Sequence, residues 1–436
     1  AGATAASGAG APAPSMSSSA GAGGTAVAPV ESFVTEPNDE AAYLFDASKV
    51  RSYNILIAPA DLAMLNQQPS AEIWVPAQLE FEGQTFGPLK VRYKGSDGSF
   101  KAPCTRGGAD DPKAGKCSIK LGFDEVDETL RFFKLKKLNF HAMNNDPSLL
   151  RDRLGYSLFR DSHVVAPRAV HAQVSINGTP EGLFVAVEQI DGRFTRARFS
   201  EGGEGNVYKQ TWLTNHGEQE FIAALETNSE VHDVTGMLAF KAAIQKDAKA
   251  TEQFLDREYM ARYLAVDRVI VNDDGALHFY CDPNSPPSYA VGNGNYYWYQ
   301  SAENNRFWLI PWDLDLAFDG TPWVTIQPAW TAKAACTCVA PPSMYAPQMP
   351  PSCDGLVKRF LEWRDDYEDA VDEFIAGPFS AANVAKKLDA WTPQLEPFVM
   401  EAASIRRGPK LADWQSAVDE LRAKIESQRT HRGFAY

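Results

Sequence analysis

Apolar and polar positions alternate in short runs through the first 190 residues, a pattern that predicts β-strands. Gly and Pro break these runs, which stand at 53–57, 73–75, 78–81, 89–93, 118–121 and 132–140. Two further runs, 171–176 and 183–188, flank Asn177-Gly178, a dipeptide typical of a tight hairpin turn. We expect helices in this region only at 59–65 and after the capping sequence 146–148.

In the second half of the chain, apolar residues recur mainly at helical spacing instead. Residues 259–271 repeat apolar side chains at helical spacing, and the runs 296–299 and 306–311 predict one hairpin. The last hundred residues are mostly helical, with apolar markers at Trp391, Phe398, Leu411, Trp414 and Leu421. A β-rich half followed by a mainly helical half predicts the α+β class.

Residues 1–30 consist almost entirely of Ala, Gly, Ser, Pro and Thr, a composition that predicts a flexible linker. Such a leader is typical of the tether that remains after an export signal is removed. The sequence contains no run of about 18 consecutive apolar residues, so we expect no membrane-spanning helix. We therefore expect an extracytoplasmic protein, secreted or at the cell surface and tethered by this linker, which limited proteolysis should trim.

The six cysteines support export, since an even number in loop sequence fits disulfides formed in an oxidising compartment. Cys104 and Cys117 flank one polar loop, and we expect them to pair. The spacing Cys-Thr-Cys lacks the form of a zinc knuckle, and no histidine stands nearby. Two more bridges are expected, in a pairing that stays open, among Cys281, Cys336, Cys338 and Cys353.

The charge balance argues against nucleic acid as a partner. The formal net charge is −14 and the isoelectric point is about 5.1, so phosphate backbones are repelled. The one basic run, 134–137, alternates with apolar residues and is better explained as a strand.

Candidate chemistry is densest between 271 and 320. There Asp274, Asn295, Asp313 and Asp315 follow apolar or aromatic runs. Carboxylates that converge in apolar surroundings favour a hard cation, because unpaired buried charge is costly. Phosphoryl transfer needs one Asp at the acceptor hydroxyl and an Asn and a second Asp on the metal. A single Asp here would be explained as a solvated turn residue, whereas the whole set favours function.

Three motifs in this region stand in a familiar order. They are Asn272-Asp273-Asp274, then Gly294-Asn295-Tyr296-Tyr297-Trp298-Tyr299, then Ile310-Pro311-Trp312-Asp313-Leu314-Asp315. Together they resemble the CotH (spore coat protein H) kinase family, with Gly294 in place of the family's His and an insertion-like stretch at 283–287. Further matching segments, within a resemblance that covers about 50–320, are 92–96, 138–140, 150–154, 176–184, 188–191 and 205–209.

The resemblance implies a divergent two-lobed protein-kinase-like fold. It implies a β-rich N-lobe at 31–190 and a mainly helical C-lobe at 191–436, with catalytic and metal loops at 272–320. By the same resemblance Asp274 is the expected catalytic Asp. The expected metal residues are Asn295, Asp313 and Asp315.

The nucleotide side is also implied by the resemblance. Residues of the turn 95–99 are expected to cover the phosphates: Gly95, Ser96, Gly98 and Ser99. Lys120 is the expected phosphate-contacting lysine, with Lys136 and Lys137 as rivals, and Glu188 to Ile190 are expected to line the adenine side. Asp267, with Asn272 five residues on, mimics an ordinary kinase catalytic loop, but it lies inside the periodic helix and is expected to be structural.

The functional expectation is an atypical protein kinase that uses ATP and Mg²⁺, or Mn²⁺ or Ca²⁺. Its substrates would be Ser or Thr hydroxyls of secreted or surface proteins. The alternative is a non-catalytic, cation-binding surface protein, structural or adhesive, with the same fold. A hydrolase is disfavoured, since neither Gly-x-Ser-x-Gly nor His-Glu-x-x-His occurs.

Overall fold

The computed structural model describes residues 32–95, 116–282, 290–319, 336, 338 and 347–432, which belong to one compact unit that begins at Ser32. The predicted linker 1–30 lies outside the described residues, as do Ser96, Gly98, Ser99 and the stretch 283–287. The fold is a mixture of helices and sheets, as expected for the α+β class.

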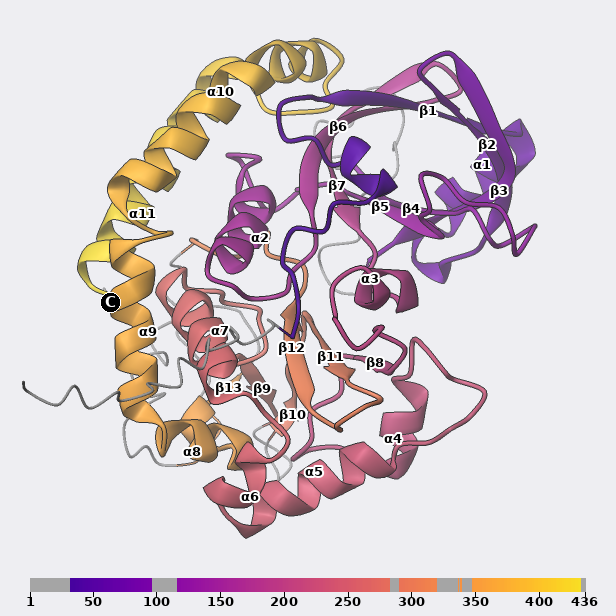
Figure 1. Ribbon diagram of the computed structural model, residues 1–436. Coiled ribbons are helices and arrows are strands. Elements are labelled where there is room, and N and C mark those ends of the chain that lie inside the picture. Colours follow the sequence, from indigo (N-terminus) through magenta and orange to yellow (C-terminus); the bar gives the residue numbers. More distant parts are fainter. Residues whose placement is uncertain are drawn as a thin grey trace, which may run out of the picture. The chain divides into compact units, whose positions relative to one another are not determined.

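Seven strands of the first half close into a barrel (Figure 1, indigo to magenta), in the order β1-β2-β3-β4-β5-β7-β6. All neighbours pair antiparallel except β1 and β6, which close the barrel as a parallel pair. Inward side chains alternate with outward ones, as along Val75–Phe81, and fill the barrel with a core of their own. The strands are β1 Arg51–Ile57, β2 Val75–Phe81, β3 Gln84–Lys94, β4 Ser118–Gly122, β5 Lys137–His141, β6 Ala169–Ile176 and β7 Thr179–Glu188.

One predicted strand is partly wrong. Only Lys137–His141 of the run 132–140 joins the barrel. Phe132 and Leu135 instead exchange backbone hydrogen bonds of 3.1 and 2.9 Å, and Phe133 and Lys134 between them have positive φ. The chain therefore makes a tight turn where the apolar run predicted a strand. The run is apolar because the side chains of Phe132 and Leu135 are buried in the barrel core.

Helix α2 (Arg151–Asp161) connects β5 to β6 and carries a nearly continuous run of buried residues. Its N-cap residue is Leu150, so it begins slightly later than the predicted capping sequence 146–148 implies. Asp146 accepts hydrogen bonds from the backbone N–H groups of Ser148, at 2.9 Å, and Arg151, at 2.7 Å. The other short elements around the barrel are η1 Glu40–Tyr43, α1 Pro59–Gln67, η2 Pro69–Ala71 and α3 Gly192–Arg196.

The second half contains two small sheets as well as helices. One has the order β12-β11-β8 and the other β10-β9-β13. Their strands are β8 Asn206–Lys209, β9 Phe279–Cys281, β10 Ala290–Gly292, β11 Tyr296–Gln300, β12 Phe307–Pro311 and β13 Gln348–Met349. The helices are α4 Glu218–Ala223, α5 Thr235–Lys246, α6 Ala248–Glu252, α7 Arg257–Val269, η4 Pro351–Cys353, α8 Gly355–Leu361, α9 Arg364–Ala376, α10 Ala381–Ser404 and α11 Leu411–Thr430.

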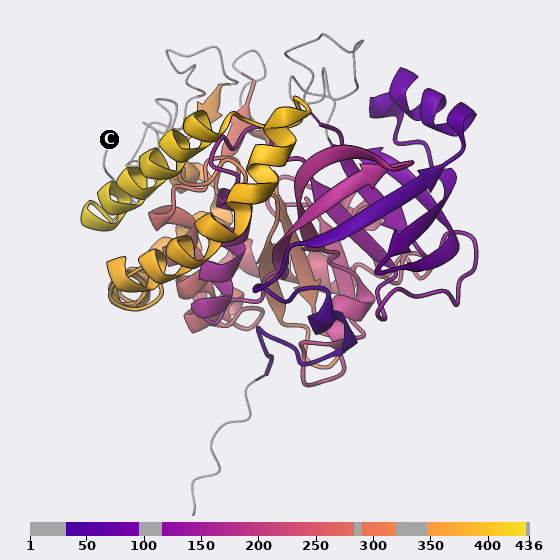
Figure 2. The same cartoon turned by 90° about the horizontal axis from the view of Figure 1, so that it is seen from above.

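A second, larger core holds these elements together, and aromatic side chains such as Trp212 and Trp298 are fully buried in it. The long helices α10 and α11 pack side by side along one flank (Figure 2, yellow), and α10 also contacts β7. The indole N–H of Trp414 in α11 donates to the carbonyl of Ser148 at 2.8 Å, which ties this flank to the start of α2.

The predicted bridges among the four later cysteines are confirmed, and their pairing is now defined. Cys281 pairs with Cys338, and Cys336 pairs with Cys353. Cys117 is disulfide-bonded as well, while its predicted partner Cys104 lies outside the described residues. Among the described helices, none is both long and apolar enough to cross a membrane.

Candidate functional site

A cavity of about 280 Å³ lies where the barrel meets the loops that follow α7 and β12. Basic and acidic side chains both line it. The basic ones come from β3, from β4 and the residues just before it, and from β8: Arg92, Lys94, Lys116, Lys120 and Lys209. The acidic ones are Glu72 and, from α2 and the two loops, Asp152, Asp274, Asp313 and Asp315.

Asp274 and Asn295 meet in this cavity from different elements. Asp274 lies in the turn after α7, and Asn295 precedes β11 with a φ of +59°. The Asn295 amide donates to Asp274 Oδ2 at 2.7 Å and to the Asp274 carbonyl at 3.0 Å. The Tyr280 hydroxyl donates to the other carboxylate oxygen. Burial, with a smaller contribution from the negative charge of Asp313, raises the Asp274 pKa to about 6.

Asp313 and Asp315 follow β12 directly. The backbone N–H of Asp313 donates to the Tyr156 hydroxyl at 2.9 Å, and Asp315 accepts from Asn145 at 3.1 Å. Burial raises the pKa of Asp315 well above its usual value, and the nearby negative charge of Asp313 adds to this. Such crowding of carboxylates is relieved by a bound cation, so the donor set fits a hard metal ion.

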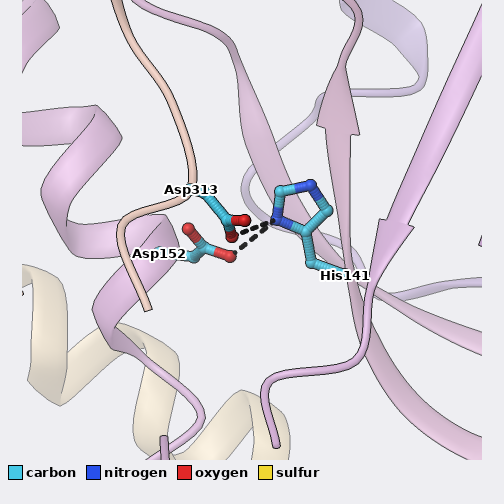
Figure 3. Close-up of side chains that lie close together, drawn as sticks. All are labelled: His141, Asp152 and Asp313. Atoms are coloured by element: carbon cyan, nitrogen blue, oxygen red, sulfur yellow. Dashed lines mark hydrogen bonds and ion pairs between the residues drawn. The ribbon is translucent and has the colours of Figure 1, made fainter. Parts of the chain in front are cut away.

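His141, Asp152 and Asp313 form a second grouping within the same cavity (Figure 3). His141 Nδ1 lies 2.9 Å from Asp152 Oδ2 and 3.7 Å from Asp313 Oδ1. One ligand atom from each residue lies within 4.8 Å of the others, so the three could hold a metal ion once Nδ1 is free of its proton.

The lysines differ in their surroundings. Lys94 Nζ lies 2.9 Å from His141 Nε2 and 5.1 Å from the centre of the Trp312 ring. Burial lowers the pKa of Lys120 to about 7, and the positive charge of Lys94 contributes. The Lys120 ammonium makes no hydrogen bond or ion pair within the described part of the chain, whereas its rivals pair with acids. Lys136 lies 3.9 Å from Asp124, and Lys137 lies 3.2 Å from Glu125.

Of the predicted phosphate-covering turn, only Gly95 is described, and it lies at the cavity with a φ of +136°. Ser96, Gly98 and Ser99 lie outside the described residues.

The predicted adenine side is arranged differently from the expectation. Glu188 is fully buried and accepts from the guanidinium groups of Arg168, Arg193 and Arg198. Burial alone would raise its pKa, but the three arginines hold it well below its usual value. Ile190 is buried in the larger core. The cavity is lined instead by the residue between them, Gln189, whose Oε1 accepts from Asn139 at 3.2 Å.

A second cavity of about 290 Å³ adjoins the first, and Lys120 and Gln189 line both. Its other lining residues are polar and include Asp191, Arg193 and Glu226. Lys120 and Gln189 therefore lie between two polar cavities.

Asp267 lies within α7 and is fully buried. Its Oδ1 accepts from the Asn272 side chain at 2.8 Å, and its Oδ2 accepts from Arg268 Nε at 2.8 Å. Its contacts therefore hold the start of the loop that carries Asp274.

Several cavity residues were not predicted to act in the site, among them Lys94, His141, Asp152 and Lys209. These four stand in or directly after segments that resemble the family, namely 92–96, 138–140, 150–154 and 205–209. Membership of those segments could have pointed to these four residues. Their residue types alone did not distinguish them from ordinary strand and helix residues.

Known proteins match much of this chain. Residues 92–431 match the family model described as CotH kinase protein. The inner spore coat protein H of Bacillus subtilis (strain 168) is 24% identical over 290 residues, which are 62% of this chain and 69% of that protein. The inner spore coat protein H-like protein of the same organism is 40% identical over 53 residues, 12% of this chain and 17% of its own.

A solved structure, the Helicobacter pylori proinflammatory kinase CtkA, aligns with 70% of this chain and 92% of its own. The sequence identity is 10% and the TM-score is 0.26.

Proposed function

This chain belongs to the CotH kinase protein family, and from that premise we propose that it is an ATP- and metal-dependent protein kinase. Its acceptors would be Ser or Thr hydroxyls of secreted or surface proteins. The observation that carries the proposal is one cavity lined by both lysines and carboxylates. A nucleotide triphosphate needs both, because cations bind its phosphates and carboxylates bind its metal.

In this proposal Asp274 is the catalytic residue. Its carboxylate accepts the proton of the acceptor hydroxyl while the hydroxyl oxygen bonds to the γ-phosphorus. The bond from the γ-phosphorus to the bridging oxygen breaks, and ADP leaves with that oxygen. The donors Asn295 and Tyr280 hold the carboxylate in place for this transfer.

Asp313, Asp315 and the amide oxygen of Asn295 would hold the divalent ion. When bound, this ion neutralises charge that develops on the phosphates. Asn295 uses its amide nitrogen on Asp274, which leaves its oxygen as the remaining acceptor. His141 and Asp152 lie close enough to Asp313 to orient this set.

The phosphates would lie against Lys94 and Lys120, beside Gly95, where a side chain is absent. The base would extend past Gln189 into the second cavity. We also propose that the chain divides into kinase-like lobes near residue 190. The barrel then serves as the N-lobe, and 191–436 serves as the C-lobe.

The proposed location is extracytoplasmic, because two disulfides join segments of the second half and such bonds persist in oxidising surroundings. The acidic net charge of −14 disfavours nucleic acid as the acceptor.

Transfer of radiolabelled γ-phosphate tests the proposal. We expect label on a Ser/Thr-rich protein acceptor, or on the chain itself, with Mg²⁺ or Mn²⁺ and none after chelation. The matched control is Asp274→Asn, which keeps the size of the side chain and removes the base. Absence of transfer with Mg²⁺, Mn²⁺ and Ca²⁺ would reject the kinase and leave a cation-binding surface protein of the same fold.

A further inference from the structure

A chain of hydrogen bonds crosses the cavity from the barrel to helix α2. Lys94 is the last residue of β3, His141 is the last residue of β5, and Asp152 is in the first turn of α2. Lys94 Nζ lies 2.9 Å from His141 Nε2, and His141 Nδ1 lies 2.9 Å from Asp152 Oδ2 (Figure 3 shows the second of these contacts). His141 and Asp152 are only 3% and 1% exposed, so water does not replace these contacts.

The far end of this chain is the loop of proposed metal ligands. Asp152 Oδ1, the oxygen that does not face His141, accepts from the backbone N–H of Leu314 at 2.8 Å. Leu314 stands between Asp313 and Asp315. The Asp152 carboxylate therefore connects the His141 imidazole to the backbone segment that carries Asp313 and Asp315.

Other residues of α2 hold the same loop. The Tyr156 hydroxyl accepts from the N–H of Asp313, and Arg151 donates to the carbonyl of Asp315 at 3.2 Å. Gly155 lies directly against Leu314, since a Cβ added at 155 would stand 2.8 Å from the Leu314 side chain. These residues recur at helical spacing, so one face of α2 is fitted to 313–315.

The contacts favour one tautomer of His141. When Lys94 is an ammonium group it can only donate a hydrogen bond, and Nε2 then accepts it. The neutral ring then carries its proton on Nδ1 and donates it to Asp152. With the proton on Nε2, an N–H group would face the ammonium and Nδ1 would face two carboxylates, so both contacts would be repulsive.

We infer that His141 and Asp152 are positioning residues, which couple Lys94, proposed to contact the phosphates, to Asp313, proposed to bind the metal. The inference rests on the proposed function. It adds an account of how the residues proposed to bind phosphate and those proposed to bind metal are held in fixed positions relative to each other. Protein kinases make a direct ion pair between a sheet lysine and a helix glutamate for a similar purpose. Here an imidazole spans the distance between lysine and carboxylate.

The first test reads the tautomer and needs no nucleotide. The full chain is labelled with ¹⁵N-histidine, and His141 is identified among the seven histidines by its loss in His141→Leu. We expect the Nδ1–H tautomer in the wild type. An Nε2–H ring in the wild type would overturn the inference.

The second test uses phosphate transfer. Asp152→Asn and His141→Leu should each lower kcat/KM for ATP at least tenfold and raise the metal concentration needed for half-maximal rate. His141→Gln should recover part of the loss, since its amide offers one acceptor and one donor. Ser157→Ala is the control on the same helix, because its hydroxyl bonds only the Leu154 carbonyl, at 2.9 Å, among the residues that the structure describes.

The two tests fail separately. If the wild type transfers no phosphate, the tautomer experiment still decides whether the hydrogen-bonded chain exists. If the wild type transfers phosphate and Asp152→Asn and His141→Leu keep its kinetic constants, the coupling is rejected while the kinase stands.

Discussion

Asp274 and Asp313 are chemically alike, but their surroundings prepare them for different work. Asp274 receives hydrogen bonds on both carboxylate oxygens, from Asn295 and Tyr280. The Asp313 side chain is 41% exposed and faces His141 at 3.7 Å, so it retains room for another ligand. At the residue scale, therefore, Asp274 is suited to accept a proton and Asp313 to bind an ion.

Substitution should separate these two roles. ATP that binds only the folded state at a hundredfold excess over Kd adds about 2.7 kcal/mol to the free energy of unfolding. We expect the wild-type Tm to rise with Mg-ATP or Mn-ATP but not with ATP and chelator. Asp313→Ala should abolish the rise because it removes a metal ligand, whereas Asp274→Ala should keep most of it and lose only transfer. An equal thermal response in both variants would contradict the assignment.

At the scale of elements, the decisive fit is that of α2 against the loop after β12. Helix α2 places Asp152, Gly155 and Tyr156 on one face, and each contacts the segment 313–315. A shift of α2 would therefore move the proposed metal ligands.

Gly155→Ala tests how closely the helix and loop are fitted. Alanine is favoured over glycine inside a helix by about 1 kcal/mol, so a loosely packed site would be stabilised. Here the new Cβ would lie 2.8 Å from Leu314 Cδ1, and an overpacking cost of roughly 1–3 kcal/mol should leave a net loss of up to about 2 kcal/mol. Denaturant unfolding measures the change. The double variant with Leu314→Ala should lose less than the sum of the two single variants, and simple additivity would argue against the contact.

Local patterns could predict the elements better than their assembly. Alternation located most strands, and the dipeptide Asn177-Gly178 correctly predicted the β6–β7 hairpin. Barrel closure depends on β1 pairing with β6 across more than a hundred residues, which no local pattern records. The candidate site, too, could be predicted from the sequence only in part. The motif residues Asp274, Asn295 and Asp313 do line one cavity, but the role of His141 depends on where the end of β5 meets α2.

At the scale of the whole molecule, folding buries histidines that must stay neutral. His171 donates from Nε2 to the Leu149 carbonyl at 2.6 Å and accepts from Arg153 at 3.1 Å. Burial, with the nearby positive charge of Arg153, lowers its pKa to about 3. Burial likewise lowers the pKa of His278 to about 3, with Arg268 contributing. Both resist protonation only while the chain is folded.

Stability should therefore decline as the pH falls below about 6.5. Between pH 6.5 and 3 the unfolded chain binds more protons at these histidines, so the free energy of unfolding decreases with falling pH. One such histidine contributes a loss of roughly 2–3 kcal/mol by pH 4.5, at about 1.4 kcal/mol per pKa unit. His171→Gln keeps a donor and an acceptor but does not titrate. Urea unfolding at pH 7 and pH 4.5 should show a smaller difference in this variant, and an unchanged difference would contradict the prediction.

The parallel closure of the barrel has a consequence for the way this chain reaches its folded state. Strand β1 pairs on one side with β2, but its other side stays open until residues 169–176 have emerged and become β6. An unpaired strand edge is a template for another chain, and pairing across so long a loop is slow to form. During synthesis or export, the vulnerable species is therefore a partly built, open sheet. We expect association between chains to compete with folding mainly before β6 has formed. Once β6 pairs with β1, that strand edge is no longer open to another chain.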